Sequence, residues 1–298
     1  MKNIVFVGHG DLMLDKIYDH NFKLLKQDGG GCNWNTLYNI AANGETCYAI
    51  GTCGKDEEGR LTLESLQRVN INTNFVEFED KRTNVMNIII PDEKLQDNSI
   101  VHTWTCPVTG VRTVNFSDNL PTTIPEELED KDLYIVLDRF RQVNLDFINN
   151  IQNKKVCLDI GHINYFKEFS GEYLNNYLKH VDFALLNKEC APDIFAKVGV
   201  DNLEDFYNLY NFDLLAFTAG KKSAKFLFKE NGHTVFIEKT PEIIDDVTDN
   251  TGAGDAFFAE LIRAYAHKKV VNAEFVDFAF KAANEATKKT VQHLGSRK

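Results

Sequence analysis

Short apolar runs alternate with polar helical segments along most of this chain. The first run, residues 5–7, ends at glycines, and four similar runs follow from Asp132 onward: LYIVLD, KKVCLDIG, VDFALLN and FDLLAFTAG. Continuous apolar runs of this length are typical of strands that are buried on both faces. Because each run is followed by a polar helical segment, the pattern predicts βαβ units and a mainly parallel sheet.

Residues 75–116 show a different pattern of polar and apolar positions. Polar and apolar positions alternate in TNVMNIII and in SIVHTWTC, and the polar segment PDEKLQDN separates these two stretches. A period of two residues predicts antiparallel β ribbons rather than helices. We therefore expect a second, smaller layer of strands apart from the parallel sheet.

Three local signals add detail to this outline. Asp56 precedes the amphipathic stretch EEGRLTLESLQRV, which predicts an N-cap and a helix. Asn231 and Gly232 join two alternating runs and favour a type I′ hairpin turn. The stretch FVDFAFKAANEATKKTVQHLGS predicts an amphipathic helix followed by a loop.

Polar residues stand at the ends of several predicted strands. They are Asp138, Asp159, Asn187 and Thr218, and carboxylates also follow the first strand. In open α/β sheets, ligands bind just outside the carboxyl ends of the strands. These side chains therefore predict a site along one edge of the sheet.

A glycine-rich string, DNTGAGDA, opens the apolar helical run FFAELIRAYA. Gly252 and Gly254 leave consecutive backbone N–H groups bare at the positive end of a helix, an arrangement that holds an oxyanion. Asp255 follows, where a carboxylate suits a base that accepts a proton from a hydroxyl. An anion site beside a base indicates group transfer. For this motif alone, a plain helix N-terminus with an aspartate cap is the alternative.

DNTGAGDA resembles the DTxGAGD signature of the PfkB, or ribokinase-like, family of carbohydrate kinases, with Asn250 where the family usually has threonine. The resemblance implies that Gly252, Ala253 and Gly254 stabilise the transferring phosphoryl group and that Asp255 deprotonates the acceptor hydroxyl. It also implies an α/β fold: a three-layer αβα sandwich with a mainly parallel central sheet. Residues 1–298 would form a single domain, with a small β-sheet lid formed by about 12–27 and 75–116.

A second resemblance lies at the end of the first strand. Residues 10–15, GDLMLD, are similar to the family's G(E/D)xxxD segment, whose second aspartate grips sugar hydroxyls. That position is Asp15, and Asp11 is the weaker candidate for substrate binding. A carboxylate offers several acceptor sites to vicinal hydroxyls. The alternative for Asp15 is a solvated turn residue.

A third resemblance covers residues 29–44, GGGCNWNTLYNIAANG, which look like the family's GGxxxN element. Gly30, Gly31 and Asn35 match its positions and would bind the substrate. The amide of Asn35 offers a donor and an acceptor to a pair of hydroxyls. A helix N-cap is the alternative for Asn35, and Trp34 is expected in the core before any stacking role.

The nucleotide side of the family pattern is weaker in this chain. Asn187 begins NKEC, which is similar to the family's NxxE, whose glutamate helps to organise Mg²⁺ through water. Cys190 stands at the glutamate position, so Glu189, one residue early, is the candidate near the metal. We still expect Mg²⁺, because ATP brings it and water completes its octahedron.

TAGKKS, residues 218–223, resembles the family's TxGxxG, with Ser223 at the second glycine position. Thr218, Gly220 and Lys222 are therefore the expected ATP-binding residues, whereas Lys221 fits a solvated turn better. Family members often bind a monovalent cation beside the anion site. In this chain Asp249 and Asn250 lie near that position, and the substituted Asn250 weakens the expectation of potassium dependence.

Composition excludes several other classes of protein. The chain has 298 residues, 43% of them hydrophobic, which suffices for one large core. A net charge of −11 and no basic stripe argue against nucleic acid as a partner. No run approaches a membrane span, no signal peptide is recognisable, and six cysteines without CxxC spacing suit free thiols, so we expect a cytoplasmic protein.

Together these patterns predict an ATP-dependent kinase that phosphorylates a hydroxyl, usually a primary one, of a sugar or sugar derivative. The acceptor stays open among a ketose or pentose, a glycated amine and a nucleoside. A sensor that kept the fold and lost turnover is the alternative that Cys190 and Ser223 motivate. A dinucleotide-dependent oxidoreductase is a weaker alternative, because this chain has no GxGxxG fingerprint after its first strand. Exposed strands in the lid favour a homodimer.

Overall fold

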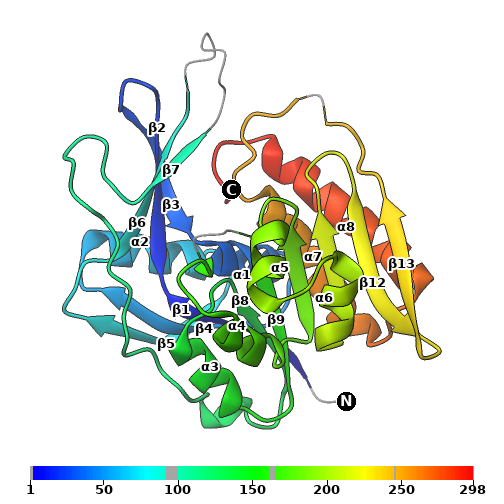
Figure 1. Ribbon diagram of the computed structural model, residues 1–298. Coiled ribbons are helices and arrows are strands. Elements are labelled where there is room, and N and C mark those ends of the chain that lie inside the picture. The colour runs from blue at the N-terminus through cyan, green and yellow to red at the C-terminus, as the bar shows by residue number, and fades with distance from the viewer. Residues whose placement is uncertain (1–2, 92–99, 162–164, 245, 298) are drawn as a thin grey trace.

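The computed structural model describes residues 3–91, 100–161, 165–244 and 246–297. Its largest element is a nine-stranded sheet (Figure 1). The strands, in spatial order, are β13 (His233–Lys239), β12 (Ala224–Glu230), β11 (Leu214–Thr218), β10 (Phe183–Asn187), β9 (Lys154–Ile160), β8 (Asp132–Leu137), β1 (Ile4–Asp11), β4 (Cys47–Gly54) and β5 (Asn72–Glu79). All neighbours from β5 to β11 pair in parallel, and β12 and β13 add an antiparallel hairpin.

Helices cover both faces of this sheet (Figure 1). One face carries α1 (Cys32–Ala42), α7 (Ala253–Lys268) and α8 (Ala273–Val291), and the other carries α3 (Gln142–Asn149), α4 (Gly171–Leu178), α5 (Ala191–Val198) and α6 (Leu203–Tyr210). Phe6 of β1 belongs to the first apolar cluster, whereas its neighbours Val5 and Val7 belong to the second. Successive side chains of a strand point to opposite faces, so the apolar β1 run joins both clusters. The predicted three-layer αβα sandwich is confirmed.

A second sheet of four strands stands beside the central one (Figure 1). Its order is β3 (Leu24–Gly30), β2 (Met13–Tyr18), β6 (Asn84–Ile89) and β7 (Val101–Thr103). The helix α2 (Glu57–Gln67) packs against β2 and β3. The small sheet confirms that the alternating segments form a layer of their own.

The composition of this small sheet differs from the sequence prediction in two respects. Residues 75–79 lie in β5 and pair in parallel with β4 of the central sheet, so the ribbon prediction is wrong there. Strand β6 pairs in parallel with β2, although β6 and β7 are antiparallel as predicted. Strand β5 is an edge strand with one exposed side, so its alternation of polar and apolar residues looks the same as that of a ribbon. Most of the PDEKLQDN segment lies outside the described residues.

The local signals of the sequence are confirmed. The Asp56 carboxylate caps α2 by accepting a hydrogen bond from the Gly59 N–H at 2.9 Å. Asn231 and Gly232 have φ of 51° and 82° and join β12 to β13.

All six cysteines are free. Within the described ranges, no helix combines the length and the apolar character that crossing a bilayer requires.

Candidate active site

The N-terminus of α7 has the geometry that its glycines predict. Gly252 is the N-cap residue with φ of 80°, and a Cβ there would lie 2.5 Å from the Cβ of Ser296, so a side chain would be strained and crowded. The first intrahelical hydrogen bond runs from the Ala256 N–H to the Gly252 carbonyl. Gly254 faces open space. The Ala253 N–H donates to the Asn250 carbonyl at 3.2 Å, so the other N–H groups at the start of α7 are the donors that a ligand can use.

Asp255 lies in the first turn of this helix and contacts Asn35 of α1. The Asn35 Nδ2 amide donates a hydrogen bond of 2.9 Å to the Asp255 Oδ2, across a sequence separation of 220 residues. Asn35 is not a helix N-cap, because α1 begins one turn earlier and Gly31 is its N-cap. The structure therefore joins the GGxxxN and GAGD elements directly. Trp34 is fully buried, as its expected core role requires.

Burial raises the pKa of Asp255 to about 6, and the negative charge of Asp138 adds to this effect. The Asn35 hydrogen bond acts in the opposite direction, since it stabilises the charged carboxylate. The pKa of Asp15 rises further, to about 7, mainly through burial; Arg297 opposes this rise and Asp255 contributes to it. The two carboxyl groups therefore share one electrostatic environment.

Asp15 lies on β2, and its carboxylate packs against Gly30 of the neighbouring strand β3. A Cβ at Gly30 would lie 1.9 Å from the Asp15 Oδ1, so only glycine leaves room for this carboxylate. Gly31 has φ of 89°, which only glycine adopts without strain, and it turns the chain from β3 into α1. These two glycines thus place Asp15 and Asn35 at the same site. Asp15 is buried rather than a solvated turn residue.

Sequence reasoning missed Arg297, which is 1% exposed and lies in the segment after α8. Its guanidinium donates from Nε to the Asn35 Oδ1 at 2.9 Å, and from its terminal nitrogens to the Ser65 Oγ at 2.8 Å and the Gly30 carbonyl at 3.2 Å. It also stacks on the Tyr38 ring. No sequence pattern predicts a buried arginine in a loop, so only its contacts reveal this role.

The contact with Arg297 fixes the orientation of the Asn35 amide. Because the guanidinium has only donors, the Asn35 oxygen must face Arg297 and the amide nitrogen must face Asp255. The segment around Arg297 is held in turn by Lys26 of β3, whose Nζ donates to the carbonyls of Leu294 and Arg297 at 2.8 and 2.5 Å. This segment therefore links the small sheet to the site.

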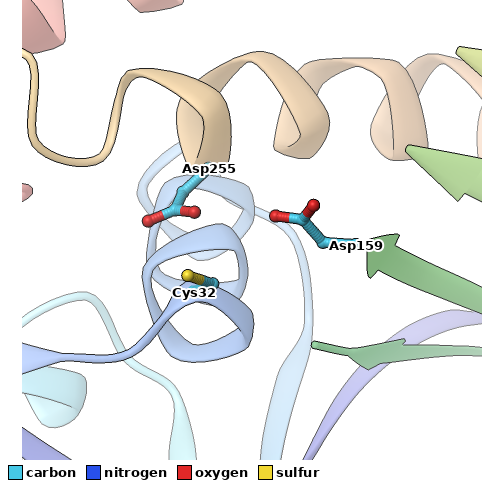
Figure 2. Close-up of side chains that lie close together, drawn as sticks. All are labelled: Cys32, Asp159 and Asp255. Atoms are coloured by element: carbon cyan, nitrogen blue, oxygen red, sulfur yellow. The ribbon is translucent and has the colours of Figure 1, made fainter. Parts of the chain in front are cut away.

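Three chemically active side chains from different elements converge here (Figure 2). Cys32 of α1, Asp159 at the end of β9 and Asp255 of α7 bring a sulfur and two carboxylate oxygens within 4.8 Å of one another. Within the described part of the chain, Asp138 Oδ2 and Asp159 Oδ1 are buried without a hydrogen-bond partner. The sequence placed Asp138 and Asp159 at this edge of the sheet, but it gave no sign of their approach to Cys32.

Asp11 is also buried, but its oxygens are engaged by other residues. Its Oδ1 contacts the Lys81 ammonium at 2.6 Å and accepts from the Ser117 N–H, and its Oδ2 contacts Arg141 at 2.7 Å. These contacts connect the end of β1 to the segments that carry Lys81, Ser117 and Arg141. A role in substrate contact stays a prediction.

The residues expected on the nucleotide side lie at the ends of β10 and β11. Asn187 and Thr218 are register partners on these neighbouring strands. Gly220 and Lys222 lie in the turn that follows, which the hydrogen bond from the Ala219 N–H to the Ser223 carbonyl closes. Glu189 and Lys222 are exposed, whereas Cys190 is buried in the apolar cluster.

Asp249, expected near a monovalent cation, is buried just before the glycine string. Its Oδ1 accepts from the Thr251 N–H and its Oδ2 from the Gly295 N–H, both at 2.8 Å. Asn250 is exposed, and its carbonyl accepts from the Ala253 N–H. Asp249 thus fastens the glycine string to the segment after α8.

Comparison with known proteins decides the family. The family model described as "pfkB family carbohydrate kinase" matches residues 1–298. The chain belongs to this family. It is therefore a carbohydrate kinase, a phosphotransferase of an ATP-using family, as the sequence motifs predicted.

Relatives agree with this placement. An ATP-dependent 6-phosphofructokinase from Thermoanaerobacterium thermosaccharolyticum is 24% identical over 91% of this chain and 86% of its own length. The nucleoside kinase of Methanocaldococcus jannaschii has a TM-score of 0.74 at 19% identity, covering 99% of this chain and 93% of that chain. Aminoimidazole riboside kinase from Salmonella enterica, complexed with aminoimidazole riboside and an ATP analogue, has a TM-score of 0.72 at 19% identity, with 99% and 95% covered. These solved structures confirm the ribokinase-like fold.

Proposed function

We propose that this kinase transfers the γ-phosphoryl group of ATP to a hydroxyl, primary in the simplest case, of a sugar or sugar derivative. Asp255 acts as the base, and the N–H groups of Gly252, Ala253 and Gly254 form the anion hole. The observation that carries this proposal is the hydrogen bond between Asn35 and Asp255 beside the open N-terminus of α7. This hydrogen bond holds the Asp255 carboxylate next to the backbone N–H groups at the start of α7.

The raised pKa of Asp255 suits a base. A general base works best when its pKa lies near the working pH, because it is then ionised and still able to take a proton. The pKa of about 6 meets this condition. The proton of the acceptor hydroxyl would pass to Asp255 while its oxygen attacks phosphorus, and the bond to the β-phosphate oxygen would break.

The proposed anion hole would stabilise the negative charge on the transferring phosphoryl group. Phosphoryl transfer depends mainly on positioning and on stabilising the charge of the equatorial oxygens. The N–H donors at the start of α7 and the positive end of its dipole suit this task without any side chain. Gly254, beside open space, lets the phosphoryl group approach the backbone closely.

For the acceptor we propose a site built by Asp15, Gly30, Gly31 and Asn35. Next to it, Arg139 and Asp138 line a small pocket that also includes Asp11. The Arg139 guanidinium lies 4.3 Å from the Tyr165 ring centroid and 4.5 Å from that of Phe116, which holds its plane in place. Asp138 Oδ2 has no hydrogen-bond partner among the described residues, so together with Arg139 it offers an acceptor and donors to further hydroxyls of the substrate.

For the nucleotide we propose Asn187, Thr218, Gly220 and Lys222. Mg²⁺ would neutralise charge on the ATP phosphates, and the exposed Glu189 carboxylate fits contact with it through water. Cys190 does not fit, because its thiol is packed in the core. A monovalent cation would lie near Asp249 and Asn250, beside the backbone that carries the anion hole.

The small sheet is proposed to act as a lid over the acceptor, excluding water and so suppressing ATP hydrolysis. Strand β3 already reaches the site through Gly30 and Lys26. Apolar side chains on this sheet are exposed, namely Leu24, Leu25 and Val101. They favour a homodimer that forms through the lid.

The proposal is tested by ADP release with Mg-ATP across a panel of ketoses, pentoses, glycated amines and nucleosides. Acceptor-dependent release on one class identifies the substrate. The nucleoside alternative is favoured when nucleosides alone support release. Ligand binding by calorimetry without release on any compound would overturn the proposal and favour a sensor.

We expect kcat/KM to fall below about pH 6, because protonation of Asp255 removes the base and burial places its pKa near that value. A single essential group gives about a tenfold loss per pH unit below its pKa. The measurement is kcat/KM between pH 5 and pH 8 at constant ionic strength. A flat profile across this range would contradict the assignment of Asp255.

A further inference from the structure

The group formed by Cys32, Asp159 and Asp255 has the composition of a metal site. Their sulfur and oxygen atoms come from three different elements and lie within 4.8 Å of one another; the Asp159 carboxylate points toward Asp255, and Cys32 lies next to Asp255 (Figure 2). The ligand atoms from α1, β9 and α7 are thus close enough for small side-chain movements to bring them onto one ion. Little chain ordering would accompany binding.

A second observation also points to a ligand at this group. Asp159 is 6% exposed, its Oδ1 has no hydrogen-bond partner among the described residues, and it is aimed at Asp255. Burial raises the pKa of Asp159 and of the Cys32 thiol well above their usual values, and the carboxylates of Asp138 and Asp255 add to the rise. Buried acidic groups of this kind are stable only when protons or a cation neutralise them.

We propose that Cys32, Asp159 and Asp255 bind a thiophilic divalent cation, Zn²⁺ being the representative ion. One thiolate and two carboxylates leave a fourth position of a tetrahedral zinc for water or a ligand. Binding converts the Cys32 thiol to a thiolate and releases its proton. The hard ion Mg²⁺ is a poor competitor, because it prefers oxygen ligands throughout.

Such an ion occupies the carboxylate that the proposed mechanism uses as base. Zinc is therefore an inhibitor of the kinase, released by a chelator, and this consequence rests on the proposed function. Metal binding itself does not, because it depends only on the three side chains. An experiment can therefore contradict the zinc site without contradicting the proposed kinase function, and the reverse.

The test is the zinc content and affinity of the purified protein, measured with excess Mg²⁺ present. Chelator-treated wild type that is then incubated with Zn²⁺ is expected to retain one Zn²⁺ per chain after gel filtration, and Co²⁺ in its place is expected to give a thiolate-to-metal absorption band. Cys32→Ala and Asp159→Asn should each weaken Zn²⁺ binding at least about 100-fold, since even the substitution of residues behind metal ligands costs 10- to 100-fold. The loss of the cobalt band should accompany Cys32→Ala.

Cys106→Ala is the matched control. Cys106 is half-buried in the small sheet region, and hydrogen bonds lower the pKa of its thiol despite partial burial, so an adventitious zinc would prefer it. Unchanged affinity in Cys106→Ala supports the proposed site. Substoichiometric zinc in wild type, unchanged affinity in both Cys32→Ala and Asp159→Asn, or displacement of zinc by Mg²⁺ would each overturn it. Stoichiometric zinc that leaves turnover intact would retain the site and contradict Asp255 as base.

Discussion

Replacing Asp255 by asparagine is expected to lower kcat about 10³-fold and to leave the affinity for ATP unchanged, since a general base contributes roughly 10²- to 10⁴-fold. The amide keeps the size of the side chain but cannot accept the proton of the acceptor hydroxyl. The anion hole belongs to the backbone and is not altered. ADP release gives kcat, and calorimetry gives the dissociation constant for ATP.

Asp201→Asn is the control for this variant, because Asp201 is an exposed carboxylate that lies in a loop before α6. We expect it to retain wild-type turnover. Thermal unfolding of both variants shows whether either substitution damages the fold. Turnover of Asp255→Asn within tenfold of wild type would refute the role of Asp255 as base.

Replacing Arg297 by methionine is expected to lower the free energy of unfolding by about 3 kcal/mol, the magnitude typical of removing one member of a buried charged group. The substitution leaves the Asn35 oxygen and the Gly30 carbonyl without their donor. It also removes a positive charge that lowers the pKa of both Asp255 and Asp15. The acidic limb of kcat/KM should therefore move to higher pH.

The pH profile separates positioning from simple stability. Arg297→Lys keeps the charge but loses the planar set of donors, so we expect a smaller shift of the acidic limb with a clear loss of kcat/KM. Arg60→Met is the control, because Arg60 is exposed and pairs with Glu57 and Glu64 of its own helix. Exposed ion pairs contribute little, so this variant should keep the free energy of unfolding and the pH profile of wild type. An unshifted acidic limb in Arg297→Met would contradict its influence on Asp255.

Local patterns predicted the secondary structure around the proposed site well, because each pattern consists of adjacent residues. The GAGD string, the GGxxxN element and the apolar β1 run each specify a turn, a helix start or a buried strand through their own sequence. The hydrogen bond between Asn35 and Asp255 then follows from motifs that were both recognised. The family assignment rests on the same strings.

The pairing of strands was predicted less well, because the residue pattern of one strand does not determine which strand lies next to it. Residues 75–79 alternate as a ribbon would, yet they form β5 at the edge of the central sheet. Strand β6 likewise pairs with β2 in parallel, across a long stretch of chain. Hydrophobic periodicity indicates which face of a strand is buried, but it does not determine which strand pairs with its edge.

The amino-acid sequence by itself determined the family, the parallel αβα architecture and the identity of the proposed base, since short-range glycine turns and apolar periodicity encode these features locally. Tertiary structure alone decided that Arg297 orients Asn35, that Asp11 is held by Lys81 and Arg141, and that Cys32 and Asp159 approach Asp255. These contacts join residues far apart in the chain, and the low dielectric of the packed interior strengthens their hydrogen bonds and charge interactions. Such an interior exists only once the layers have packed.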